Sequence, residues 1–138
     1  MNEATDNIIN WSSFSEARSG LGADFIRILG YFREDGIKSV ASIEQAMREK
    51  NAAALVIPAH TLKGESAQFG AEKLTEVAER IEMVARQCVE HREEPDELLP
   101  LVVGLRALFE TSLTALEKET NPLVKRDNGD TRPPVMAN

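Results

Sequence analysis

The stretch Ala59-His60-Thr61-Leu62-Lys63-Gly64-Glu65-Ser66-Ala67-Gln68-Phe69-Gly70 has the spacing of an amphipathic helix. At 3.6 residues per turn, His60 points almost opposite Phe69, towards water, with Lys63 and Gly64 beside it. The opposite, inward stripe consists of Leu55, Ala59, Leu62, Ser66 and Phe69. The stretch therefore predicts a helix that packs through one face and presents a histidine on the other.

The same helical period recurs through the rest of the chain, with no convincing strand alternation. It predicts a short first helix near residues 13–18 and longer helices at about 22–49, 52–69, 71–90 and 96–118. Four helices of comparable length with short connections favour an antiparallel, up-down-up-down four-helix bundle. The expected fold class is all-α, with the short N-terminal helix as an addition to the bundle.

Several residues predict where these helices begin, bend or end. Ser13 and Glu16 have the spacing of a capping box at the start of the first helix. Gly36 weakens the middle of the second helix and predicts a bend. Pro58 removes a backbone donor within the third helix, which predicts a kink or a later start there. Gly70 is the expected stop of that helix.

Length and composition restrict the class of protein. A chain of 138 residues with 42% hydrophobic and 28% charged residues suits one globular domain. We expect a lead-in over residues 1–10, a bundle over 11–118 and, because breakers dominate there, a disordered tail over 119–138. The net charge of −7 argues against nucleic-acid binding.

The sequence shows no secretory signal and no long uninterrupted apolar run, so we expect a cytoplasmic protein without a membrane span. The single cysteine, Cys88, lies on an apolar stripe and is interpreted as a buried structural thiol. Neither it nor His60 or His91 has the spacing of a metal site, so we expect no bound metal.

His60 and its neighbours carry the most informative chemistry. Imidazole is a competent nucleophile near neutral pH, and Lys63 could offset the charge of an attached group. Gly64 leaves open the space that a side chain four residues on would cover. Taken singly, each has a plainer interpretation: a surface histidine, a solvated lysine, and a glycine that allows close helix packing.

The motif Ala59-His60-x-Leu62-Lys63-Gly64, followed by Ser66, Gly70 and Leu74, resembles the signature of the histidine-containing phosphotransfer (HPt) family. The helix order extends the resemblance to about residues 10–118. In that family the histidine accepts a phosphoryl group from a receiver-domain aspartate and passes it to another receiver. The resemblance implies that His60 is the phospho-acceptor, Lys63 a charge partner and Gly64 the clearance residue.

The family commonly places Gln or Glu 22 residues after the histidine, and Glu82 occupies that position here. The resemblance implies that its carboxylate accepts a hydrogen bond from Nδ1–H of His60 and leaves Nε2 free to attack. The alternative is a solvated acid on the helix surface. Glu65 and Pro58 depart from the usual pattern and put the local helix geometry in question.

These observations predict a phosphorelay intermediate of two-component signalling, a carrier rather than an enzyme. The chain has no nucleotide-binding loop, so we expect no cofactor of its own, with Mg²⁺ and most catalytic groups on the partner. We expect the chain to be a monomer whose partners are receiver domains of response regulators or hybrid histidine kinases. The predicted docking residues are Ala53, Ile57, Ala67, Phe14, Leu21 and Ile26.

Two other functions remain open from the sequence. A helical adaptor could bind a response regulator without carrying phosphate, in which case His60 would be dispensable. A phosphatase acting on phosphohistidine or phosphoaspartate is less favoured, because no second catalytic group accompanies the histidine.

Overall fold

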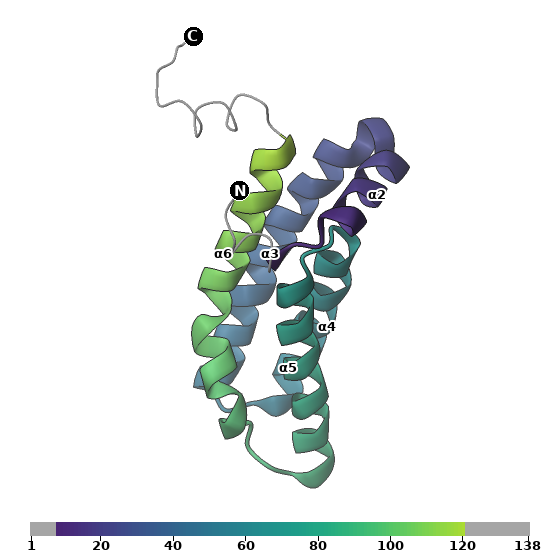
Figure 1. The fold of residues 1–138 in the computed structure, drawn as a ribbon. Helices are drawn as coiled ribbons and strands as arrows, with labels where there is room; N and C mark the ends of the chain where they lie inside the picture. The colour runs from purple at the N-terminus through teal and green to yellow at the C-terminus, as the bar shows by residue number, and fades with distance from the viewer. Residues whose placement is uncertain (1–7, 121–138) are drawn as a thin grey trace, which may run out of the picture.

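The computed structural model describes residues 8–120, and every extended element among them is helical, which confirms the all-α class. Three longer helices and a shorter one follow the N-terminal helix, with two single turns of 3₁₀ helix between them (Figure 1). The elements are α2 (Trp11–Leu21), η1 (Gly22–Asp24), α3 (Phe25–Arg48), α4 (Ala52–Gln68), α5 (Glu72–His91), η2 (Asp96–Leu98) and α6 (Leu99–Thr120).

Helices α3, α4, α5 and α6 pack side by side along their length (Figure 1). Helix α3 contacts both α4 and α6, and α5 also contacts both. Arg33 on α3 pairs with Glu117 at the end of α6, whereas Glu44, further along α3, pairs with Arg106 nearer the start of α6. These two helices therefore run in opposite directions.

Helix α2 covers one end of the bundle, beside the start of α3 (Figure 1). Its N-cap is Asn10, whose side chain accepts a hydrogen bond from the backbone N–H of Ser13 at 3.1 Å. The predicted capping box was therefore wrong: the helix begins at Trp11, and Ser13 lies inside it. Asn10 is the better cap because its amide oxygen reaches the free N–H groups of the first turn.

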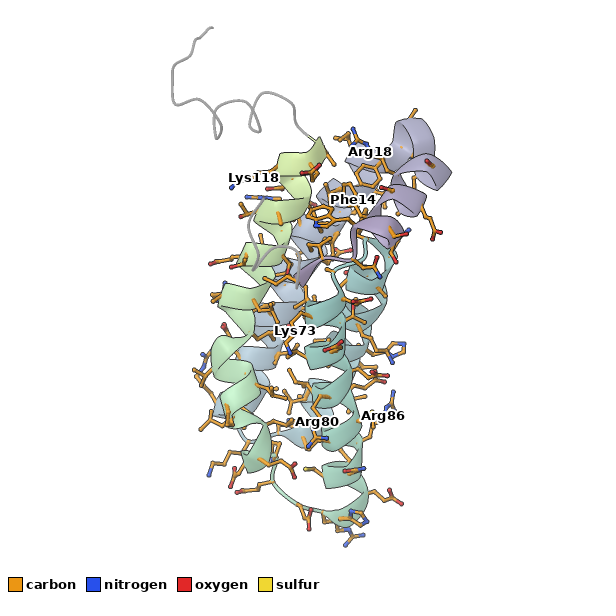
Figure 2. The ribbon with its side chains drawn as sticks, in the orientation of Figure 1. Phe14, Arg18, Lys73, Arg80, Arg86 and Lys118 are labelled. Carbon is orange, nitrogen blue, oxygen red and sulfur yellow. The ribbon has the colours of Figure 1, made fainter. Side chains whose placement is uncertain are left out.

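A row of aromatic rings joins this end to the bundle core. Phe14 packs edge-on against Phe25, with ring centres 5.5 Å apart, and Phe25 packs against Phe69. Phe14 is only 3% exposed. Its prediction as an exposed docking residue was wrong, because α2 turns this ring into the core instead of towards a partner (Figure 2).

Gly36 does not interrupt α3, which runs without a break from Phe25 to Arg48. A Cβ atom at Gly36 would lie 2.3 Å from Cε1 of Phe109 on α6, far inside van der Waals contact. The glycine is thus explained by a close approach of two helices, and not by the predicted bend.

Pro58 lies within α4, which starts at Ala52, so the later start that proline predicted does not occur. The backbone bond that Pro58 cannot make would have ended on the carbonyl of Ala54, an exposed residue whose carbonyl can turn to water. Gly70 follows α4 with a φ of 77°, a conformation that favours glycine, and the predicted stop is confirmed.

The boundaries of the bundle differ slightly from the prediction. Helix α6 continues to Thr120, two residues beyond its expected end at Lys118. Ile9, placed in the lead-in, is 2% exposed and belongs to the core. The remainder of the predicted tail, residues 121–138, lies outside the described residues.

The segment Asp96–Thr120 is long and apolar enough, by composition, to cross a membrane. In the structure it packs against α3 and α5, and Leu105, Phe109 and Leu116 are buried in the core.

Candidate functional site

Helix α4 presents His60 to solvent. The predicted inward stripe is confirmed, because Leu55, Ala59 and Leu62 are fully buried, as are Ser66 and Phe69. Asn51 caps the helix by accepting a hydrogen bond from the N–H of Ala54 at 3.1 Å. With the buried stripe fixing the rotation of α4, the side chain of His60 is 59% exposed.

A contact between two hydroxyl groups joins α4 to α5. Ser66, fully buried, lies 2.9 Å from the hydroxyl of Thr75, and its own hydroxyl donates to the carbonyl of Lys63 at 3.1 Å. From this point the two helices run back alongside each other. The residue of α5 that meets His60 is Glu82.

Glu82 is a buried acid, with 6% of its side chain exposed, so it is not the solvated surface acid that the sequence left open. Its Oε2 lies 3.0 Å from Nδ1 of His60, which is the contact that the resemblance implied. An ionised carboxylate can only accept, so Nδ1–H is the donor. Nε2 is then the ring nitrogen that remains free.

Two cations share the same carboxylate. The Lys63 ammonium is 2.9 Å from Oε1 of Glu82. Arg86, one turn further along α5, donates from Nε at 3.0 Å and from Nη2 at 2.8 Å to Oε2. His60, Lys63, Glu82 and Arg86 form what we call the His60 cluster, two residues from each of two helices.

The cluster keeps Glu82 ionised. Burial alone would raise the pKa of its carboxyl, but hydrogen bonds from Lys63, Arg86 and His60 outweigh burial and lower the pKa to about 2. At neutral pH the cluster therefore contains a fixed negative charge between two positive ones, beside an exposed imidazole.

Gly64 leaves the approach to His60 open. A Cβ atom built at this position would meet nothing within 4 Å. Unlike Gly36, this glycine is not required by helix packing, so the packing interpretation of Gly64 is excluded. A mid-helix glycine costs roughly 0.5–1 kcal/mol relative to alanine.

Apolar surface lies on the N-terminal side of His60. Ile57, one turn earlier on α4, is 70% exposed. A shallow, mostly apolar hollow of about 290 Å³ lies between α4 and α5, lined by Ala53, Val56, Arg86, Val89 and Glu90. The predicted docking residues Ala53 and Ile57 therefore lie on the same surface as the His60 cluster.

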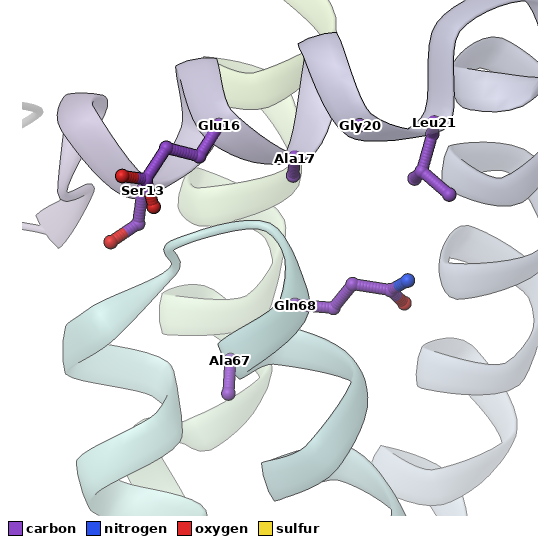
Figure 3. Close-up of a pocket in the computed structure, with 7 residues that line it drawn as sticks. All are labelled: Ser13, Glu16, Ala17, Gly20, Leu21, Ala67 and Gln68. Carbon is purple, nitrogen blue, oxygen red and sulfur yellow. The ribbon is translucent and has the colours of Figure 1, made fainter.

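A second hollow, of about 430 Å³, lies on the C-terminal side, between α2 and the end of α4 (Figure 3). Leu21 and Glu16 face Ala67 and Gln68 across it. Leu21 and Ala67 were predicted docking residues, and the structure brings them together. Ile26, at the start of α3, is 61% exposed.

The sequence interpretation missed Arg86. Figure 2 shows this side chain projecting outward from the α5 side of the bundle, away from Phe14 at the α2 end. Its signal was the four-residue spacing from Glu82, typical of a helical ion pair. That signal is common on solvent faces, and it gains meaning only because Glu82 is buried.

Other candidate chemistry is sparse in the described part of the chain. Within residues 8–120, no three side chains of His, Cys, Asp or Glu are grouped to hold a metal ion. Cys88 is buried and unpaired with another cysteine, as predicted, and burial raises the pKa of its thiol.

An exposed histidine on a four-helix scaffold, hydrogen-bonded through Nδ1 and flanked by a lysine and an open glycine, defines the class of histidine phosphotransfer domains. The family model of the Hpt domain matches residues 27–119, more than half of the chain. The chain therefore belongs to the Hpt domain family. Comparisons with curated proteins and with solved structures found no match.

Membership of this family implies a phosphotransfer role in a two-component phosphorelay. Hpt domains are phosphoryl carriers and not kinases, and they interact with receiver domains.

Proposed function

We propose that the chain accepts a phosphoryl group on Nε2 of His60 from a receiver-domain aspartyl phosphate and passes it to a second receiver. The observation that carries this proposal is the contact of 3.0 Å between Nδ1 of His60 and the buried carboxylate of Glu82. It fixes the tautomer of an exposed ring and leaves Nε2 as the nucleophile.

The neighbouring residues have supporting roles in this proposal. Lys63 is 30% exposed and can turn from Glu82 towards a phosphoryl group, which carries a charge of about −1.5 to −2. Gly64 gives the incoming aspartyl phosphate its clearance. The receiver supplies Mg²⁺, and the chain contributes a positioned nucleophile and local charge.

The docking surface that we propose surrounds His60 and combines the two hollows. It includes Ala53 and Ile57 on one side and Leu21 and Ala67 on the other, with Ile26 at the edge. Apolar side chains with a charged centre suit a small interface that forms and separates quickly. We further propose that the chain acts as a monomer, which the single core cluster shared by the described helices supports.

The decisive experiment is transfer from a panel of phosphorylated receivers carrying labelled phosphate. We expect label to move onto the chain, to be lost in acid as a phosphoramidate bond is, and to disappear in His60→Gln with the helical content unchanged. His91→Gln is the matched control, since it changes the other histidine at the end of α5. Label on His60→Gln would refute the assignment.

The same experiment separates the alternatives. An adaptor would bind a receiver and leave the label on it, and a phosphatase would release free phosphate. To test the docking surface, Ile57→Ala should slow transfer about tenfold, whereas Val103→Ala should not, because Val103 is equally exposed but lies on α6. Equal rates for both variants would remove Ile57 from the interface.

A further inference from the structure

The residue that contacts His60 carries a full negative charge, and this has a consequence for the phosphorylated state. An amide at position 82 could also accept from Nδ1–H, so orientation of the ring does not by itself require a carboxylate. In this chain the acceptor is an acid held ionised by Lys63 and Arg86. A charged acceptor can therefore act on more than the tautomer.

The movement of electrons during phosphoryl transfer shows where the charge of Glu82 acts. The lone pair on Nε2 attacks phosphorus, the N–P bond forms, and the P–O bond breaks with its electron pair leaving on the receiver carboxylate. No proton moves, so the ring, which still carries Nδ1–H, becomes a phosphorylated imidazolium with one positive charge. An anion 3.0 Å from Nδ1 stabilises that charge, as a buried carboxylate does for the imidazolium of a catalytic triad.

The reverse step depends on the same proton. When a carboxylate of the next receiver attacks phosphorus, the N–P electron pair returns to Nε2. With the proton on Nδ1 the departing group is neutral imidazole; without it the departing group is an imidazolate anion, which leaves far less readily. Loss of the Nδ1 proton would therefore hold the phosphoryl group on the chain.

We propose that the ionised carboxylate of Glu82 retains the proton on Nδ1 of phosphorylated His60 and so keeps the phosphoryl group transferable at and above neutral pH. This inference rests on the proposed function and deepens it. Glu82 acts as a positioning residue, because it contacts the ring and not the reacting nitrogen.

The other charged groups around the ring also affect the proton on Nδ1. Lys63 on α4 and Arg86 on α5 are the cations of the cluster, and both oppose a positive ring. In the phosphorylated state the phosphoryl group, with a charge of about −1.5 to −2, offsets Lys63 on the Nε2 side, and Glu82 is the anion on the Nδ1 side. The acid of α4 itself, Glu65, lies beside Asp35 of α3 on a different side of the helix. Replacing Glu82 by glutamine would remove the anion that contacts Nδ1 and pairs with Arg86.

The test uses the full chain loaded on His60 with phosphoramidate, a small donor that needs no receiver. The Nδ1 proton is followed by ¹⁵N and ³¹P NMR while the pH is raised from about 5.5 to about 9.5. We expect the titration midpoint of the phosphorylated ring in Glu82→Gln to lie at least about one pH unit below that of the unaltered chain. Release of the phosphoryl group should slow above the same midpoint.

Two further variants make the result specific. Glu79→Gln removes an exposed acid one turn earlier on α5 and should leave the midpoint unchanged. Glu82→Asp keeps the charge at a greater distance from Nδ1 and should give an intermediate midpoint. This variant also provides the test if circular dichroism shows that the glutamine variant is misfolded. An equal midpoint in the unaltered chain and a folded Glu82 variant overturns the inference.

Failure of the proposed function gives a different result. A chain that loads from phosphoramidate, with a midpoint that depends on Glu82, but takes no label from any receiver would support the inference and refute the relay. A chain that does not load on His60 at all would overturn both.

Discussion

The contrast between two glycines of α3 gives a sharp test of the packing. Gly36 lies against Phe109, and a Cβ atom there would be 2.3 Å from Cε1 and 2.5 Å from Cζ of that ring. Gly30, two turns earlier, has nothing within 4 Å of the corresponding position. The same change to alanine should therefore have opposite effects at the two positions.

The magnitudes follow from the two environments. At Gly30, alanine should stabilise the helix by roughly 0.5–1 kcal/mol. At Gly36 the same gain is outweighed, because carbon atoms prefer a separation of about 3.5–4.0 Å and the buried ring must move by more than 1 Å. Overpacking of this kind costs about 1–3 kcal/mol. After the helix gain of roughly 0.5–1 kcal/mol is subtracted, we expect Gly36→Ala to destabilise by about 1 kcal/mol net.

The assay is urea unfolding followed by circular dichroism at 222 nm, with both variants compared at constant m-value. The double variant Gly36→Ala/Phe109→Leu should lose less stability than the sum of its single changes, by about 1 kcal/mol or more, because the smaller side chain makes room. Equal stabilisation by Gly30→Ala and Gly36→Ala would refute the close approach of α3 and α6.

Three predictions concern Gly64 beside His60 and the two acids Glu82 and Glu65. Gly64→Leu should fold at least as stably as the unaltered chain, since the position is open, but accept phosphoryl groups at least about tenfold more slowly; unchanged rates would show that clearance is not its role. Because the pKa of Glu82 is lowered to about 2, the native state binds fewer protons, and its contribution to stability is present above about pH 4.5 and lost as the pH falls towards 2. Glu82→Gln should reduce that acid dependence in denaturant unfolding, and an unaltered profile would contradict the ion pairs with Lys63 and Arg86. Burial and the neighbouring Asp35 raise the pKa of Glu65 to about 7, so the native state binds more protons and loses stability as the pH rises from about 4.5 to 7. Glu65→Gln should reduce this loss of stability with rising pH and should be more stable than the unaltered chain at pH 8. Equal unfolding midpoints for the two proteins at pH 8 would contradict the raised pKa of Glu65.

The sequence predicted the helices because their periodicity is a local property. A buried stripe such as Leu55, Ala59 and Leu62 repeats at the helical period wherever the chain packs through one face. Boundaries were less accurate, since caps depend on which side chain reaches a free N–H. Asn10 takes this role at α2, although the capping-box spacing from Ser13 to Glu16 favoured Ser13.

The candidate site was accessible to sequence reasoning only in part. His60, Lys63 and Gly64 lie within one helix, where a rotation of 100° per residue fixes their relation. The contact with Glu82 joins two helices, and it was expected only through the family resemblance. Arg86 was missed because an arginine four residues after a glutamate is ordinary on a solvated helix.

The burial of Phe14 shows the same limit. Its position on a short helix could place the ring either on a docking surface or in the core, and the packing of α2 on Phe25 selected the core. Similarly, Gly36 and Gly64 are both mid-helix glycines in the sequence, but only one of them faces another helix.

The sequence by itself determined the helical class, the rotation of α4 and the exposure of His60, because each follows from the order of residues along a single helix. Only the tertiary structure decided the state of Glu82. Burial between α4 and α5 brings one histidine and two cations to its carboxylate and keeps it ionised, and an electrostatic environment of this kind is created when separate helices pack.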